Sequence, residues 1–235
     1  MLQMIRKQIR VIWRDCLWTF LAVLIGWCVG FGLLALLMTE DGSSYFTMGT
    51  LIGVFMAVML GLVGDWIGMG LYFNTQVSLG CTRKEFFWSY SIVKCLMNFV
   101  CLGILLLLGA LEDSLCCAIY QVGREVDLLY WILRAGPWAA LAVPGIGMLC
   151  GALVMRFGKK AQWVTWGVWM FGCLAVPRII GEGRENTPTV FGAVGRFCAQ
   201  IFGRVPSGVW LLAAAAAILL CYRAVWALLK KQQVT

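Results

Sequence analysis

Long apolar runs separated by short polar breaks dominate this chain of 235 residues. Six of the runs are long enough to cross a hydrocarbon layer of about 30 Å as helices that rise about 1.5 Å per residue. They cover residues 17–38, 48–73, 91–111, 131–155, 161–180 and 209–229. The pattern predicts an all-α integral membrane protein in which residues 1–235 form a single transmembrane domain with six spans.

The first sixteen residues are two-sided rather than apolar throughout. At 100° per residue an apolar stripe that includes Ile5, Ile9 and Ile12 lies beside a row of cations. Those cations are Arg6, Lys7, Arg10 and Arg14. The arrangement predicts an amphipathic connecting helix over residues 1–16 that lies in the headgroup plane before the first span. A plain positive flank would explain the cations but not the stripe.

A second two-sided segment lies between the fifth and sixth spans. Thr187-Pro188 is a favourable helix start, because threonine caps a helix and proline suits its first turn. The aromatic side of the predicted helix carries Phe191, Phe197 and Phe202. The segment is too short to cross a bilayer, so we expect a re-entrant or interfacial helix at the outer side.

Composition agrees with lipid as the solvent for much of the surface. Hydrophobic residues make up 62% of the chain and charged residues 13%, against about 45–50% and about 25% in soluble domains. Glycine recurs at spacings of four that allow close helix packing, in Gly26–Gly30, Gly49–Gly53, Gly64–Gly68 and Gly147–Gly151. We expect the glycines of the first two spans to let paired bundles pack or slide.

The distribution of charge predicts the orientation. With six spans and both termini in the cytoplasm, the inner side holds 13 of the 19 basic residues and two of the 11 acidic ones. The outer side then holds six basic and eight acidic residues, several of them in a predicted loop over residues 112–134. This asymmetry follows the positive-inside rule. Most of the basic charge therefore faces anionic lipid and cytosol, and nucleic acid is not needed as a partner.

Residues 76–90 form the polar break between the second and third spans. Gly80 interrupts the helix, and Thr82 and Glu85 have the spacing of a capping box, in which each satisfies a free backbone donor of the other. Arg83 and Lys84 mark the cytoplasmic side. Phe86, Phe87, Trp88 and Tyr90 are expected at interface depth. A positive-inside loop with a capped helix would explain the same residues without a docking role.

Asp65 is the acid that falls inside a predicted span. An intramembrane carboxylate indicates a functional site, either a transport pathway or a structural pair with a nearby cation. Lys94 lies in the first turn of the next span, where we expect its long side chain to extend back to the headgroups.

Enzyme chemistry is not evident in the sequence. Gly158-Lys159-Lys160 lacks the upstream glycine and the hydroxyl of a phosphate-binding loop, and there is no histidine to bind zinc. Most of the 11 cysteines lie in apolar runs, where free cysteine packs as a small side chain; the adjacent Cys116 and Cys117 are the one candidate for redox chemistry. We expect no enzymatic activity in this chain, no cofactor and no bound metal.

The layout resembles the permease subunits of ABC transporters of the type 2 (exporter) class. Three features carry the resemblance: the basic amphipathic helix before the first span, the two-sided segment before the sixth, and the stretch Ser78-Leu-Gly-Cys-Thr-Arg-Lys-Glu-Phe-Phe87. Leu-Gly-x-Thr-Arg followed by Phe-Phe is similar to the elbow of bacterial members. The likeness covers nearly the whole chain as architecture but only about ten residues as a motif.

The resemblance implies a multi-pass protein of the bacterial cytoplasmic membrane that works with a separate cytoplasmic ATP-binding subunit and a second permease subunit. It also implies that residues 76–90 are the coupling elbow that the ATPase moves. No ATPase is fused within these residues, and the outer loops are too short for a large extracellular domain. A stand-alone secondary transporter or channel, and a membrane sensor or assembly partner that transports nothing, remain alternatives.

Overall fold

A computed structural model describes residues 2–37, 44–120, 123–124, 127–184, 189–204 and 206–232. Almost all of these residues are helical. In chain order the elements are α1 (Leu2–Leu37), β1 (Ser44–Tyr45), α2 (Met48–Ser78), α3 (Arg83–Tyr120), β2 (Gly123–Arg124), α4 (Leu128–Phe157), α5 (Lys159–Arg184), α6 (Val190–Arg204) and α7 (Ser207–Lys230). The two short strands pair in parallel, with Ser44 opposite Gly123.

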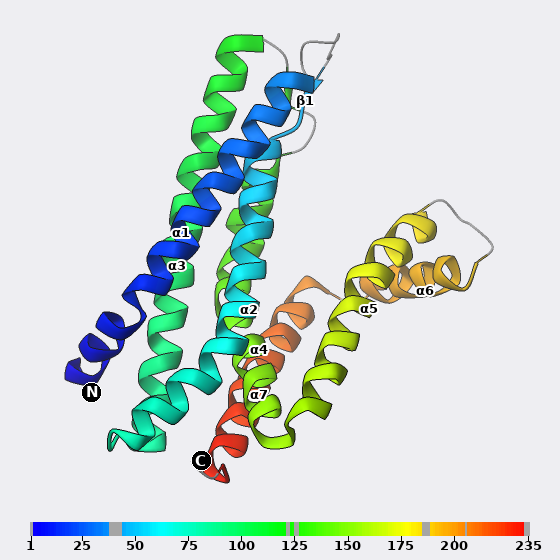
Figure 1. Ribbon diagram of the computed structural model, residues 1–235. Coiled ribbons are helices and arrows are strands. Elements are labelled where there is room, and N and C mark those ends of the chain that lie inside the picture. Colours follow the sequence, from blue (N-terminus) through cyan, green and yellow to red (C-terminus); the bar gives the residue numbers. More distant parts are fainter. Residues whose placement is uncertain are drawn as a thin grey trace.

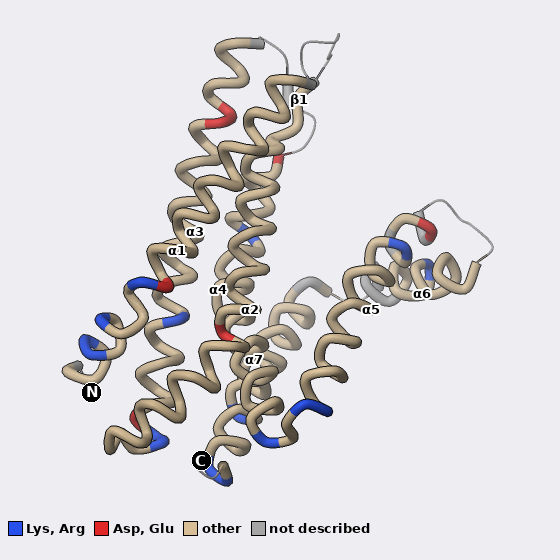
Figure 2. Tube along the Cα trace, in the orientation of Figure 1, with Lys and Arg blue, Asp and Glu red and all other residues tan. Residues whose placement is uncertain are grey.

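Helices α1 to α4 and α7 form a bundle, and α4 packs against α2, α3, α5 and α7. Figure 1 shows α5 and α6 as a wing beside this bundle, with α6 lying against α5. Both termini and the turn between α2 and α3 lie at one end of the molecule (Figure 1). Many of the Lys and Arg residues gather at that same end (Figure 2).

Five of the described helices are long and apolar enough to cross a membrane, namely α1, α2, α3, α4 and α7. These five helices support a multi-pass, all-helical membrane protein, while the bounds of the individual spans stay predictions. Helix α5, which contains the predicted span 161–180, is not among them. The sixth span stays a prediction.

Several predicted boundaries are wrong. Residues 2–16 are helical, but they continue without a break into the predicted first span, since α1 runs from Leu2 to Leu37. Their position in the headgroup plane stays a prediction. The predicted loop over residues 112–134 is also largely helical, since α3 continues to Tyr120 and α4 begins at Leu128. Polar residues can extend a helix beyond the lipid because its backbone hydrogen bonds are made within the segment. The sequence also predicts a short acidic turn over residues 39–44, of which only Ser44 lies within the described residues.

The glycine pairs act within the chain. A Cβ on Gly30 of α1 would lie 2.6 Å from the carbonyl oxygen of Met48 in α2, and a Cβ on Gly151 of α4 would lie 2.7 Å from that of Trp66. These glycines let α1 and α4 approach the backbone of α2. Gly64, by contrast, has open space around it. The expectation that the glycines of the first two spans serve contacts between bundles is therefore wrong for Gly30.

Candidate functional site

The elbow between α2 and α3 is built by two linked backbone motifs. The amide of Gly80 donates to the carbonyl of Val77 at 3.0 Å, and the amide of Cys81 donates to the carbonyl of Gln76 at 3.0 Å. Together they form the Schellman arrangement that ends many helices. Gly80 has φ +89°, a conformation that side chains of L-residues disfavour. Glycine at this position therefore permits the sharp end of α2.

A capping box begins α3, as the sequence predicts. The carboxylate of Glu85 accepts hydrogen bonds from the Thr82 hydroxyl at 2.7 Å and from the Thr82 amide at 3.2 Å, and the Glu85 amide donates to the Thr82 hydroxyl at 3.3 Å. These bonds satisfy free donors at the helix start. From this cap α3 continues to Tyr120 as one helix. The elbow is thus joined rigidly to the third span.

The aromatic band of the elbow is divided between core and surface. Phe86 is fully buried, and Phe87 and Tyr90 are buried with it. Trp88 is 49% exposed and Leu79 81% exposed. The 100° turn between residues of a helix sends Trp88 away from the face that the other three share. Three of the four aromatics therefore pack inside the protein, and their depth in the membrane stays a prediction.

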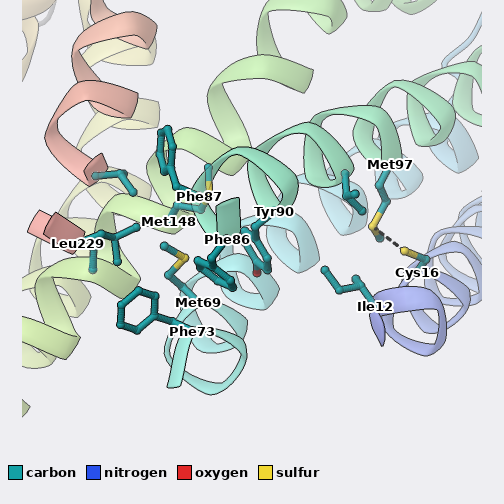
Figure 3. Close-up of a cluster of buried hydrophobic side chains, with 13 residues drawn as sticks. Ile12, Cys16, Met69, Phe73, Phe86, Phe87, Tyr90, Met97, Met148 and Leu229 are labelled. Atoms are coloured by element: carbon teal, nitrogen blue, oxygen red, sulfur yellow. Dashed lines mark hydrogen bonds between the residues drawn. The ribbon is translucent and has the colours of Figure 1, made fainter. Parts of the chain in front are cut away.

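Phe86 lies at the centre of a cluster that joins five helices (Figure 3). Its ring centroid is 5.4 Å from that of Phe73 in α2 and 5.3 Å from that of Tyr90. Phe87 reaches Trp226 of α7 at 5.5 Å. The buried members of the cluster are Ile12 and Cys16 of α1, Met69 and Phe73 of α2, Phe86, Phe87, Tyr90, Val93 and Met97 of α3, Met148 and Ala152 of α4, and Val225 and Leu229 of α7.

The two predicted elbow cations have different environments. Arg83 donates from Nη1 to the carbonyl oxygen of Lys230 at 2.8 Å, so it ties the start of α3 to the end of α7. Lys84 is exposed. Arg83 therefore serves the protein's own packing, whereas Lys84 is open to a partner.

The first half of α1 confirms the predicted two-sidedness in part. Arg6, Lys7, Arg10 and Arg14 are all exposed. Ile12 is fully buried in the cluster around Phe86. Ile9, expected on the same stripe, is exposed instead. This half of α1 packs on the bundle with one narrow edge and presents its cations outward.

Asp65 forms an ion pair with Lys94. The two charged groups are 2.6 Å apart, and their side chains are 2% and 8% exposed. The Lys94 ammonium also lies 5.5 Å above the centre of the Tyr90 ring, a favourable cation–π position. The expectation that Lys94 extends back to the headgroups is wrong, because the Asp65 carboxylate in the neighbouring helix α2 offers it a closer partner. The pairing favours the structural interpretation of Asp65.

The outer amphipathic segment forms α6, but its cap differs from the predicted one. The Gly192 amide donates to the hydroxyl of Thr189 at 3.0 Å, so Thr189 caps the helix rather than Thr187. Thr187 and Pro188 lie outside the described residues. The Phe191 ring lies 6.0 Å from the guanidinium carbon of Arg178 in α5. Phe197 is exposed, and the Phe202 side chain is outside the described part of the chain.

The structure reveals a buried carboxylate in a segment that the sequence predicted to be a loop. Glu112, fully buried near the end of α3, accepts hydrogen bonds from the amides of Gly49 and Thr50 at 2.9 and 2.7 Å. Its carboxylate thus binds the start of α2, where free amides and the helix dipole favour a negative charge. The glutamate's place at the end of an apolar run was the available sequence signal.

Reactive chemistry is not evident at the elbow or elsewhere in the described part of the chain. The cysteines there are free thiols, Cys116 and Cys117 among them, and the described residues contain no group of three metal-binding side chains. Partial burial, with the nearby Glu85 carboxylate, raises the pKa of the Cys81 thiol, so this elbow cysteine stays protonated.

Comparison with known proteins adds no relative. No protein-family model, curated protein or solved structure matches the chain.

Proposed function

We propose that the chain is the transmembrane permease subunit of an ATP-driven exporter of the ABC type 2 class. In this proposal it lies in the bacterial cytoplasmic membrane with the end that bears the termini in the cytoplasm. A separate ATP-binding subunit docks on the elbow, and a second permease subunit completes the transport path. The chain itself hydrolyses nothing.

The single observation that carries this proposal is the position of the elbow at the junction of the bundle. Phe86 and Phe87 belong to one buried cluster with residues of α1, α2, α4 and α7. Interiors of this kind are close-packed and transmit displacement rather than absorb it. A force applied to the first turn of α3 therefore acts on five helices together, as rigid-body rocking of a bundle requires.

Three exposed residues of the elbow are suited to docking. Together we call them the elbow surface, which consists of Leu79, Lys84 and Trp88. All three side chains are exposed, although Leu79 and Trp88 are large and apolar. A tryptophan, an aliphatic side chain and a cation are suited to a protein interface, in which an apolar centre carries affinity and charges guide association.

The test is association with an ATP-binding subunit. The tagged chain is purified from its native membrane in mild detergent, and co-purifying proteins are labelled with a photoreactive ATP analogue. We expect one labelled cytoplasmic subunit to co-purify with the unmodified chain, and Leu79→Asp combined with Lys84→Glu to release it while the helical content is unchanged. Lys159→Glu serves as a matched control, because Lys159 is an exposed cation at the start of α5.

Retention of the labelled subunit by the double variant would contradict the role of the elbow. Recovery of the chain without any ATP-binding subunit, with transport continuing in vesicles that lack ATP, would favour a stand-alone transporter or channel. Phe86→Ala is unsuitable for this test, because a buried phenylalanine truncated to alanine costs about 3–5 kcal/mol of stability.

A further inference from the structure

A groove between α3 and α7 is a second candidate binding site. Its volume is about 820 Å³. Apolar side chains form most of its walls, among them Trp88, Leu96, Phe99, Leu219 and Trp226. Two cations, Lys84 and Arg223, also line it, and the lining includes no acidic residue. The groove is therefore apolar with a cationic part.

The order of these residues along the helices gives the groove a direction. Arg83 at the start of α3 bonds the Lys230 carbonyl at the end of α7, so the two helices are antiparallel and their ends are level. Lys84 lies at this end. Arg223 lies seven residues before Lys230, which is about 10 Å further into the bundle at 1.5 Å per residue. Both cations thus belong to the half of the groove nearer the basic end of the molecule.

The length of the groove suits one bilayer leaflet. On α3 it extends from Lys84 to Phe99, which is about 22 Å of helix. Half of a bilayer, headgroups included, measures about 20–22 Å. The two tryptophans lie near the cationic end, at the depth where indole rings gather in membrane proteins. Along the groove the cations, the tryptophans and the apolar walls come in the same order as the headgroup, the interface and the acyl chains of one bilayer leaflet.

Neither cation lies within ion-pair distance of a carboxylate among the described residues. Tyr222, also in the lining, has its hydroxyl occupied: it lies 3.1 Å from the Cys95 sulfur and donates to the Leu141 carbonyl at 3.1 Å. The polar groups left open to a ligand are thus mainly positive. A ligand with an anionic head and an apolar body complements them.

We propose that this groove binds one anionic phospholipid. The phosphate lies between Lys84 and Arg223, and an acyl chain follows Leu96, Phe99 and Leu219. Basic pockets between membrane helices on the cytoplasmic side are suited to anionic headgroups because charge attraction adds to the burial of the chain. Because Lys84 also belongs to the elbow surface, the lipid headgroup touches the element that the ATP-binding subunit is proposed to move. The lipid site does not rest on that function.

The test measures lipid binding to the purified chain alone. Native mass spectrometry of the delipidated protein in detergent gives the dissociation constant of the first bound lipid for dioleoyl phosphatidylglycerol and dioleoyl phosphatidylcholine. We expect the anionic lipid to bind at least about tenfold tighter, since each nearby cation contributes roughly fivefold. Arg223→Gln and Lys84→Gln should each raise the dissociation constant of phosphatidylglycerol by about fivefold and leave that of phosphatidylcholine unchanged.

Two controls keep the outcome interpretable. Lys159→Gln removes an exposed cation that lies at the basic end but outside the groove. It should change the affinity for neither lipid. Leu96→Trp narrows the apolar part of the groove and should weaken the binding of both lipids. Equal affinity of the unmodified protein for the two lipids would overturn the proposal. So would an unchanged phosphatidylglycerol affinity in Arg223→Gln, or a loss of affinity in Lys159→Gln as large as in Arg223→Gln. A dimer that excludes lipid would assign the groove to a second copy of the chain instead. None of these measurements involves the ATP-binding subunit, so failure here leaves the proposed function standing.

Discussion

The carboxylate of Asp65 in α2 lies 2.6 Å from the ammonium nitrogen of Lys94 in α3, and both side chains are almost wholly buried. In a membrane protein each of these charges alone is costly, and together they neutralise one another. The pair also joins two helices just beyond the buried cluster around Phe86, since Tyr90 contacts the Lys94 ammonium through its ring. It thus fixes how α2 and α3 pack above the elbow.

Removing one member of this pair should destabilise the protein strongly. Lys94→Met leaves an unpaired buried carboxylate, and we expect a loss of about 3–5 kcal/mol in the free energy of unfolding. Asp65→Leu combined with Lys94→Met should recover most of that loss, because no charge remains buried. Denaturant titration in micelles, followed by tryptophan fluorescence, measures both. If the double variant were as unstable as the single one, the ion pair would not explain the burial of these residues.

The contact between Glu112 and the start of α2 should be a second structural support. Glu112→Ala removes the acceptor of two buried amides. Each hydrogen bond to a charged group contributes about 1.5–3 kcal/mol to stability. For two such bonds we expect a loss of about 3–6 kcal/mol in the free energy of unfolding, with faster hydrogen exchange at Gly49 and Thr50. Ser114→Ala is a suitable control, because Ser114 is an exposed α3 residue that bonds only the Ala110 carbonyl. Unchanged exchange at Gly49 and Thr50 would contradict the capping role.

Two glycines of the first two spans should respond oppositely to the same substitution. Gly30→Ala places a methyl group 2.6 Å from the Met48 carbonyl oxygen and forces α1 away from α2. We expect a loss of about 1–3 kcal/mol from this overpacking. Gly64→Ala meets no atom within 4 Å, so the higher helix propensity of alanine should stabilise the protein by up to about 1 kcal/mol. Thermal unfolding of both variants in one detergent decides between the predicted signs.

The elbow itself should depend on Gly80. Gly80→Ala keeps the surroundings open, since no atom would lie within 4 Å of the new Cβ, but it strains a backbone with φ +89°. The expected cost is about 1–2 kcal/mol. The change should appear as faster hydrogen exchange at Cys81 and at the start of α3, where the Schellman and capping-box bonds meet. A thermal stability equal to that of the unmodified chain would show that the turn tolerates another conformation.

Some elements were predictable because their causes are local. The capping box of Thr82 and Glu85 depends on a spacing of three residues, and the structure contains it as predicted. The break at Gly80 is equally local, since it depends on the backbone freedom of one residue. Five spans were predictable from length and apolar content alone. In each case the information lies within a few residues of the feature that it predicts.

Other features depended on which helix faces meet. Phe86, Phe87 and Trp88 are adjacent aromatics, yet two are buried in the cluster and the third is exposed. Lys94 was expected to reach the headgroups but finds Asp65 instead. Glu112 was expected in a loop but binds the amides of α2. Gly49 and Thr50 lie 63 and 62 residues from Glu112, and Asp65 lies in a different helix from Lys94. No local pattern therefore identifies these partners.

The sequence by itself determined the solvent, the helices and the backbone of the elbow. Lipid as solvent follows from the excess of apolar side chains, and helices follow because lipid leaves backbone groups no other partner. Only the tertiary structure decided which faces of the helices are covered. In water an apolar face marks the core, but in a bilayer the lipid-facing and buried faces are both apolar, so this contrast is lost. The cluster around Phe86, the ion pair of Asp65 and the groove between α3 and α7 therefore emerge only when the helices are packed together.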